Sequence, residues 1–166
     1  MKERKIYKIT IETPLGAMLA SGEDDKITGL WFTDQKNFPL NTDNWISKAD
    51  YYVFMSLKAW LKEYFTGKRP AVRIPIAIEG SDFQKAVYKV LMDIPYGKTS
   101  TYGAVGKQVT SSGQTASSQA VGVALEKNPI SLLIPCHRVI GADGNLTDYT
   151  GGVDRKELLL KLEKAI

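Results

Sequence analysis

Residues 100–126, STYGAVGKQVTSSGQTASSQAVGVALE, decide the fold of the second half of the chain. Apolar residues recur there at helical spacing in two short runs, and a polar stretch with a glycine separates the runs. Two short helices joined by such a turn predict a helix-turn-helix, although the same pair also occurs in plain helical cores. The expected bounds are Ser100 or Thr101 to Val109 for the first helix, Thr110 to Gln114 for the break, and Thr115 to about Glu126 for the second helix.

Another helix is expected directly upstream of this pair. Ser81 is a suitable N-cap for a helix that runs to Met92, and the turn sequence Ile94-Pro-Tyr-Gly follows it. We place the boundary between two domains near Gly80. The inner face of this helix should carry the residues that recur at helical spacing: Phe83, Val87, Val90 and Leu91.

The N-terminal part of the chain has the pattern of a small sheet followed by a helix. Residues 5–35 form short alternating segments separated by turn residues, which predicts an antiparallel meander. Residues 34–48 are polar and are expected to form a loop. Residues 45–65 carry apolar side chains at helical spacing, and Gly67 should end that helix. The apolar residues counted for it are Tyr52, Met55, Leu57, Trp60, Leu61 and Tyr64.

Composition excludes several classes of protein. The chain has 166 residues, 43% hydrophobic and 24% charged, and no apolar run long enough to cross a membrane. The N-terminus resembles a strand, so we expect no signal peptide. A single cysteine excludes an internal disulfide and fits a cytoplasmic protein. One Cys and one His cannot supply four ligands for structural zinc, so we expect no metal. The net charge of +4 is compatible with a polyanionic partner.

The chain's only Cys and only His are adjacent, in Ile134-Pro-Cys-His-Arg-Val139. An apolar run precedes Cys136, so we expect the cysteine at the inner end of a buried, strand-like segment. A thiolate is a strong nucleophile, and a neighbouring His or Arg lowers the thiol pKa or relays its proton. The residue types alone also fit a small buried cysteine without chemistry, which is the usual state of a free Cys.

Motifs spread over almost the whole chain decide between these alternatives. In their order they resemble the methylated-DNA–protein cysteine methyltransferases, also called O6-alkylguanine-DNA alkyltransferases. The motifs are Thr13-Pro-Leu-Gly, Gly29-Leu-Trp-Phe, Phe83-Gln, Ile94-Pro-Tyr-Gly-Lys-Thr-Ser-Thr-Tyr-Gly, Ala120-Val-Gly, Asn128-Pro, Ile134-Pro-Cys-His-Arg-Val-Ile, Gly144-Asn-Leu-Thr-Asp-Tyr-Thr-Gly-Gly and Arg155-Lys-Glu-Leu-Leu-Leu-Lys-Leu-Glu163.

The resemblance implies an α+β fold of two domains. Residues 1–79 should form a ribonuclease-H-like domain, a small antiparallel sheet with a helix. Residues 80–166 should form a helical domain with the helix-turn-helix and the reactive cysteine. It implies DNA repair by irreversible alkyl transfer from O6-alkylguanine to Cys136, once per molecule and without a cofactor. The implied partner is double-stranded DNA, bound from the minor groove with the damaged base extruded; we expect a monomer.

The resemblance also implies a role for each residue of the site. Cys136 is the nucleophile, His137 takes its proton, and Glu163 orients the histidine. Tyr102 donates to the guanine ring; the less favoured alternatives are that Tyr102 simply packs in the helix pair and that Glu163 is a solvated charge. The remaining implied roles are Asn128 as a brace beneath the cysteine, Val139, Tyr149 and Thr150 as the base pocket, and Ser117, Ser118, Gln119, Gly122 and Arg138 as the DNA-binding residues.

The chain departs from the family pattern on the side expected to face DNA. Gln119 stands where most relatives carry an arginine that fills the gap left by the extruded base. Asp148 stands where an uncharged residue is usual, and Glu126 adds a negative charge at the end of the second helix of the pair. The turn over residues 109–114 is also longer than in compact relatives. These differences predict modest DNA affinity rather than altered chemistry.

Three other functions fit parts of the pattern. An alkyltransferase-like lesion sensor binds alkylguanine without repairing it, but such proteins replace the reactive cysteine, which is present here. A DNA-binding regulator that lost activity is supported only by Gln119 and Asp148. A thiol hydrolase can use the same Cys-His-Glu set, but the sequence has no separate oxyanion-hole motif. The range of alkyl groups and activity on O4-alkylthymine remain open.

Overall fold

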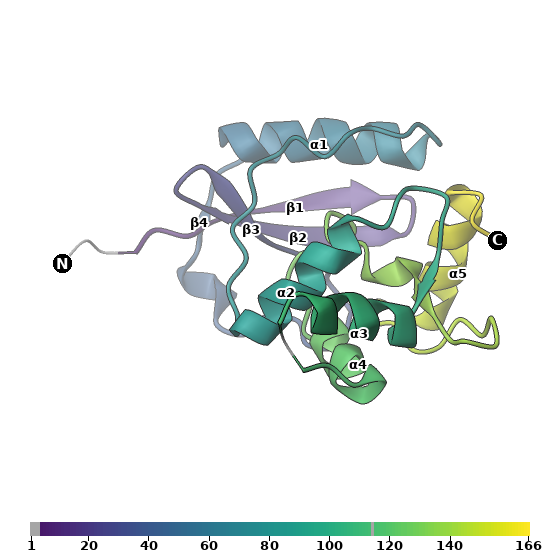
Figure 1. Cartoon of the computed structure of the whole chain (residues 1–166). Helices are drawn as coiled ribbons and strands as arrows, with labels where there is room; N and C mark the ends of the chain where they lie inside the picture. The colour runs from purple at the N-terminus through teal and green to yellow at the C-terminus, as the bar shows by residue number, and fades with distance from the viewer. Residues whose placement is uncertain (1–3, 114) are drawn as a thin grey trace. The chain divides into compact units, whose positions relative to one another are not determined.

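The computed structural model describes residues 4–113 and 115–166 (Figure 1). Gln114, at the end of the predicted break between helices, and residues 1–3 of the predicted N-terminus lie outside the described part. Internal contacts divide the chain into two units, and the boundary falls between Ile78 and Glu79. This is one residue from the boundary expected from the sequence.

The N-terminal unit is built on the predicted meander. Strands β1 (Tyr7–Thr13), β2 (Gly16–Glu23) and β3 (Lys26–Phe32) pair antiparallel in sequence order. The turn between β2 and β3 holds Asp24 and Asp25 at φ 52° and 61°. Two consecutive positive φ values are typical of the tight turns that match the twist of a hairpin, so this turn sets the register.

The predicted loop over residues 34–48 contains two short elements. A 3₁₀ turn, η1 (Thr42–Asn44), precedes strand β4 (Ile46–Ser47), which pairs parallel to β1 at the sheet edge. Over the described residues the sheet order is therefore β3-β2-β1-β4. The sequence did not reveal β4 because a strand this short has no measurable alternation.

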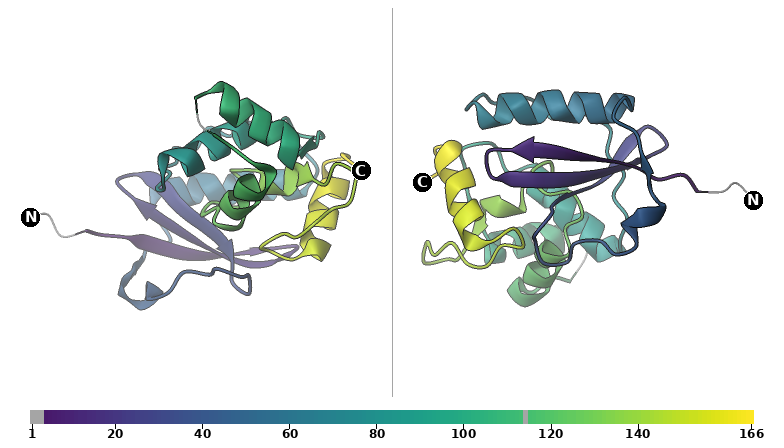
Figure 2. Two further views of the ribbon diagram at one scale, coloured as in Figure 1. Left: turned by 60° about the horizontal axis from the view of Figure 1, so that its bottom comes forward. Right: turned by 180° about the vertical axis from the view of Figure 1, so that it is seen from behind.

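Helix α1 (Tyr52–Phe65) runs along one face of this sheet (Figures 1 and 2). It begins later than predicted, because residues 45–51 form β4 and a turn. The predicted inner face was also wrong at two positions: Tyr52 and Met55 are 73% and 58% exposed. Gly67 follows the helix at φ 86°, as expected for its end. The helix buries Val53, Phe54, Leu57, Trp60, Leu61 and Tyr64.

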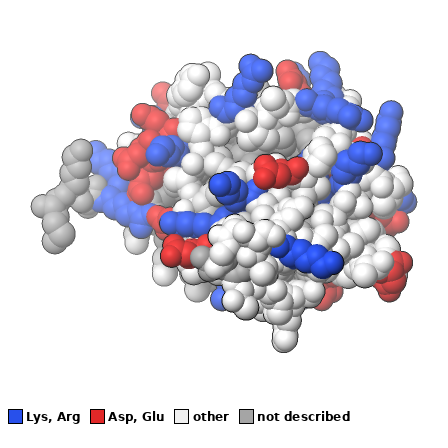
Figure 3. Space-filling model, viewed as in Figure 1, with Lys and Arg blue, Asp and Glu red and all other residues white. Residues whose placement is uncertain are grey.

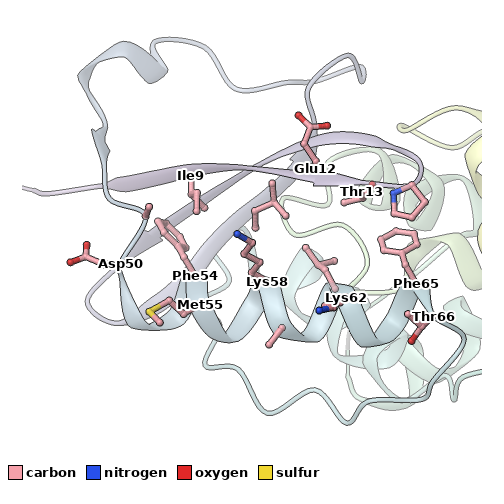
Figure 4. A pocket seen from close by; sticks show the side chains of 15 residues that line it. Ile9, Glu12, Thr13, Asp50, Phe54, Met55, Lys58, Lys62, Phe65 and Thr66 are labelled. Atoms are coloured by element: carbon pink, nitrogen blue, oxygen red, sulfur yellow. The ribbon is translucent and has the colours of Figure 1, made fainter.

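A groove of about 880 Å³ lies between β1 and α1 (Figure 4). Its lining includes Ile9, Phe54 and Phe65, and the side chains of Lys58 and Lys62 project from the helix beside it. Lys and Arg side chains gather along the edge that α1 forms in Figure 3. The groove holds no thiol or imidazole, so it is separate from the chemistry predicted for the second unit.

The C-terminal unit begins with helix α2 (Asp82–Met92). Ser81 caps it as predicted, and the Gln84 side chain reaches back to the Ser81 amide to complete a capping box. Val87 and Leu91 are buried as expected. Tyr88, which the sequence analysis left out, is also buried and donates a hydrogen bond to the Ala124 carbonyl at 2.9 Å. This bond ties α2 to a later helix of the same unit.

The predicted helix pair is present as α3 (Tyr102–Ser111) and α4 (Ser118–Glu126). The two helices contact each other and α2, and the three lie together in Figures 1 and 2. Thr101 caps α3 as expected, but Ser117 rather than Thr115 caps α4. The predicted inner face of α4 is confirmed, since Val121, Ala124 and Leu125 are buried.

The chain then leads from α4 to the last helix through short elements. A 3₁₀ turn, η2 (Cys136–Arg138), is followed by β6 (Val139–Ile140), which pairs parallel to β5 (Ser100–Thr101). Helix α5 (Val153–Leu162), which the sequence analysis did not predict, contacts η2. The β5–β6 pair therefore fixes the start of α3 beside the residues that follow the cysteine.

Candidate active site

Cys136 opens the turn η2 and is 4% exposed. Its amide donates to the Ile134 carbonyl at 2.8 Å, and a tight bridge joins Ser131 to Ile134. The predicted strand-like segment is therefore wrong: residues 130–135 curl back on themselves, with Leu132 at φ 71°. A thiol at the start of a 3₁₀ turn is held by the backbone at a fixed point rather than along an extended strand.

Asn128 braces this turn from within the same unit. It is 4% exposed, and its Nδ2 donates to the Ile134 carbonyl at 2.9 Å and to Cys136 Sγ at 3.2 Å. Its Oδ1 accepts from the Ile130 amide at 3.0 Å. One buried amide side chain thus holds both ends of the turn and supplies a donor to the sulfur.

His137 and Glu163 form a fully buried pair. His137 Nε2 lies 2.7 Å from Glu163 Oε2, and both side chains are 0% exposed. A carboxylate only accepts hydrogen bonds, so Nε2 carries the ring proton and donates it. Nδ1 is then an acceptor. It is buried and makes no hydrogen bond to any described residue, which leaves it available as a base.

Arg138 completes this cluster instead of facing solvent. Its Nε donates to Glu163 Oε1 at 2.7 Å, and a terminal nitrogen donates to Oε2 at 3.2 Å. Another nitrogen donates to the Ile94 carbonyl at 2.8 Å, and the side chain is 12% exposed. The guanidinium therefore orients the carboxylate. These contacts give no support to its predicted DNA-binding role.

The ionisation of the site is set by burial. Burial raises the pKa of the Cys136 thiol, and the Asn128 hydrogen bond and the nearby charge of Lys156 oppose part of that rise. Burial lowers the pKa of His137 despite its bond to Glu163. The resting site therefore holds a neutral thiol beside a neutral imidazole.

Lys156, on α5, is a site residue that the sequence analysis missed. It is 1% exposed, and its Nζ donates to the Val139 carbonyl at 2.6 Å and to Thr147 Oγ1 at 3.1 Å. Burial lowers its pKa to about 8. The sequence did carry a signal: Lys156 and Glu163 share the i, i+3, i+4, i+7 pattern of a buried helix face with Leu159 and Leu160.

The residues predicted to line the base pocket lie around this cluster. The Val139 carbonyl, expected to accept from guanine, accepts from Lys156. The Tyr149 ring lies edge-on to His137 with ring centroids 6.5 Å apart. Its hydroxyl is buried, and burial raises the pKa of Tyr149, an effect that Ser131 partly opposes. Tyr102 OH lies 2.7 Å from Thr147 Oγ1, and Thr150, two residues after Asp148, is half-exposed.

The predicted DNA-binding residues at the start of α4 are accessible, with Ser118 on the side of α3 and Gln119 on the side of α2. Ser117 caps the helix, Ser118 and Gln119 are exposed, and Gly122 is half-exposed. Gln119 and Ser117 also line a hollow of about 450 Å³ between α2 and α4. A Cβ atom at Gly122 would lie 3.8 Å from the Tyr102 ring. Gly122 therefore lies close to Tyr102, the tyrosine predicted to act on the guanine.

The described residues include no evident metal site and no membrane span. Across residues 4–113 and 115–166, no group of three or more His, Cys, Asp and Glu side chains is placed to bind a metal ion. In the same described part, no helix is long and apolar enough to cross a membrane. What the cluster does contain is a held thiol, a neutral imidazole base and a carboxylate anchored by arginine. Such a set is typical of proteins that use a cysteine nucleophile, and here it lies in a unit that carries a helix-turn-helix.

Comparison with known proteins agrees with this class. Residues 6–78 match the family model for the ribonuclease-like domain of 6-O-methylguanine DNA methyltransferase, and residues 82–165 match the model for its DNA-binding domain. The chain belongs to this family, and its predicted α+β fold is confirmed.

Relatives align over nearly the whole chain. A methylated-DNA–protein-cysteine methyltransferase of Methanosarcina acetivorans is 39% identical over 95% of this chain and 98% of its own length. One of Methanosarcina barkeri is 42% identical over 96% and 98%. A crystal structure of Mycobacterium tuberculosis OGT in complex with DNA superposes with a TM-score of 0.85 at 37% identity, covering 96% of this chain and 93% of that one.

Proposed function

We propose that this protein repairs DNA by moving the alkyl group of O6-alkylguanine onto Cys136, once per molecule. Two buried hydrogen bonds carry the proposal. Asn128 Nδ2 donates to the sulfur of Cys136, and the adjacent His137 is bonded to Glu163. The full-length relatives named methylated-DNA–protein-cysteine methyltransferase support it. No cofactor is required, because the protein itself is the acceptor.

The transfer is a displacement at the alkyl carbon. The thiol proton passes to His137 Nδ1, directly or through one water, while Cys136 Sγ bonds to the carbon and the bond from that carbon to O6 breaks. The imidazolium that forms is stabilised by Glu163, whose carboxylate Arg138 holds in place. The product is a thioether, which no other nucleophile in this cluster is placed to cleave.

The leaving guanine needs a proton as the bond to O6 breaks. Tyr102, at the start of α3, is the proposed donor to the ring, and the Val139 carbonyl with Tyr149 and Thr150 forms the proposed base pocket. Lys156 occupies the Val139 carbonyl in the free protein. The exocyclic amine of guanine would share or replace that contact when the base enters.

Double-stranded DNA with an alkylated guanine is the proposed partner. The O6 atom lies inside the stacked duplex, so the nucleotide must be extruded into the protein. The accessible face of α4, with Ser117, Ser118 and the small residue Gly122, is the proposed minor-groove surface, and Gln119 the residue that fills the gap. Action as a monomer and a cytoplasmic location are further parts of the proposal.

Intact-protein mass after exposure to duplex DNA with one O6-methylguanine tests the proposal against its alternatives. Repair predicts a gain of one methyl group in the wild type and none in Cys136→Ser. A lesion sensor or a DNA-binding regulator would bind the duplex without a gain in mass. A thiol hydrolase would return to its original mass. Either result, with wild-type protein that binds the duplex, would refute the proposed function.

A further inference from the structure

Three polar groups converge on the hydroxyl of Thr147, a residue to which the proposed mechanism assigns no role. Thr147 Oγ1 lies 2.7 Å from Tyr102 OH and 3.1 Å from Lys156 Nζ, and it also bonds to the Leu146 carbonyl. Tyr102 begins α3 and Lys156 lies on α5, so this one hydroxyl links the two helices.

The direction of each hydrogen bond follows from which of these groups can donate and which can only accept. A lysine ammonium only donates, a carbonyl only accepts, and a hydroxyl has one proton to give and two positions at which to accept. The Thr147 proton therefore goes to the Leu146 carbonyl. Lys156 and Tyr102 both donate to Thr147 Oγ1. In the free protein the hydroxyl proton of Tyr102 thus points to Thr147 Oγ1. Lys156 is the next proton donor in this series of hydrogen bonds.

The backbone at Thr147 is held in an unfavourable conformation. Its φ is 64°, in the left-handed region that β-branched residues rarely adopt. Such a conformation is unfavourable and persists where surrounding contacts enforce it, most often at functional sites. Thr147 combines this conformation with its hydrogen bonds to Tyr102 and Lys156.

We propose that Thr147 is a positioning residue that passes a proton from Lys156 to Tyr102 during alkyl transfer. The inference rests on the proposed function. When the bond to O6 breaks, its electron pair stays on the guanine, whose ring nitrogen takes the proton of Tyr102. Thr147 turns its hydroxyl proton to the tyrosine oxygen and takes one from Lys156. Lys156 ends neutral, and Tyr102 and Thr147 end unchanged.

The environment of Lys156 suits it to this role. Burial lowers its pKa to about 8, and the nearby Cys136 and Asp148 partly oppose that effect. His137 also faces Lys156, and the lysine charge contributes to the lowered pKa of that imidazole. Lys156 is therefore protonated at neutral pH, yet it gives up its proton more readily than an ordinary lysine. As the pH rises above about 8, a growing fraction of Lys156 has no proton to pass on.

The test uses the free base O6-benzylguanine, so that DNA binding does not enter the measured rate. Cys136 alkylation is followed from pH 6 to pH 10 in wild type, Thr147→Val and Thr147→Ser. Iodoacetamide is the control reagent, because alkylation by it needs the thiolate but no proton on a guanine. The ratio of the two rates at each pH removes the contribution of thiol ionisation.

The relay predicts that this ratio falls in the wild type above about pH 8, as Lys156 loses its proton. Thr147→Val should lower the ratio about 10-fold or more at neutral pH and abolish the fall. Thr147→Ser, which keeps the hydroxyl, should restore both. If Thr147→Val fails to fold, Thr147→Gly removes the hydroxyl at a φ that glycine tolerates.

Two results would overturn the inference and leave the proposed function standing. One is a hydroxyl-free variant with the wild-type ratio and pH profile. The other is a variant that slows both reagents equally, which would indicate a structural role. Absence of any transfer from alkylated duplex DNA to wild-type Cys136 would instead refute the proposed function itself.

Discussion

Asn128→Ala removes the residue that holds the active-site turn. The variant loses three buried hydrogen bonds, to Ile134, Cys136 and Ile130. At about 1 kcal/mol each, the free energy of unfolding should fall by about 3 kcal/mol. The Ile134 carbonyl keeps a second partner, the Cys136 amide at 2.8 Å, which limits the loss at that end of the turn.

The same substitution should slow the chemistry. A hydrogen bond to a charged group is worth about 1–2 kcal/mol more than one to a neutral group, and the sulfur gains negative charge as it attacks. Loss of the Nδ2 donor should therefore lower the rate of Cys136 alkylation by about 5–30-fold. The rate with O6-benzylguanine is the relevant assay, because it is free of DNA-binding effects.

Asn145→Ala is the matched control, since Asn145 is exposed and its side chain donates a hydrogen bond to Asp143 on the surface. It should change the free energy of unfolding by no more than about 0.5 kcal/mol. Urea unfolding measures both variants. A loss of stability in Asn128→Ala with an unchanged alkylation rate would refute the argument that its donor acts on the sulfur, and equal stability of both variants would refute the brace.

Three more results are expected. His137→Gln and Glu163→Ala should each slow methyl transfer far more than they weaken duplex binding, and the double variant should be no slower than the worse single one; multiplicative losses would rule out a shared relay. Because folding lowers the pKa of His137, the unfolded chain binds a proton below about pH 6.5 that the folded chain does not. The free energy of unfolding should therefore fall as the pH drops through that value. In urea titrations, His137→Asn should flatten this fall between about pH 6.5 and pH 5. Gln119→Arg should tighten duplex binding in a manner that weakens with salt, and Gln119→Ala should slow repair of duplex DNA but not of O6-benzylguanine; equal slowing of both substrates would place Gln119 in the fold or pocket instead.

The sequence predicted most of the helices because caps and terminating glycines are set by residues that are neighbours in the chain. Ser81 with Gln84 three residues later identifies the start of α2, and Gly67 identifies the end of α1. The start of α4 was misplaced, because Thr115 and Ser117 are both good caps and only tertiary packing selects between them. The face of α1 was misjudged at Tyr52 and Met55, since hydropathy does not show which side of a helix the sheet covers.

The site residues likewise fall into those that the sequence predicted and those that it did not. Cys136, His137 and Glu163 were found from motifs, and the structure brings the last two within hydrogen-bonding distance. The 3₁₀ turn at Cys136 was not predicted, because an apolar run bounded by proline fits a buried strand equally well. Lys156 and Thr147 were missed because their importance depends on contacts between α5, a loop and α3, which no short motif records.

The central claim is that Cys136 accepts one alkyl group and is not regenerated. The most direct measurement offers the protein a large excess of duplex O6-methylguanine, follows loss of the lesion until it stops, and locates the added methyl group by peptide mass. Repair should stop at one lesion per protein molecule, with the methyl group on the peptide that contains Cys136. Repair that continues beyond this ratio, or a methyl group on another residue, would contradict it.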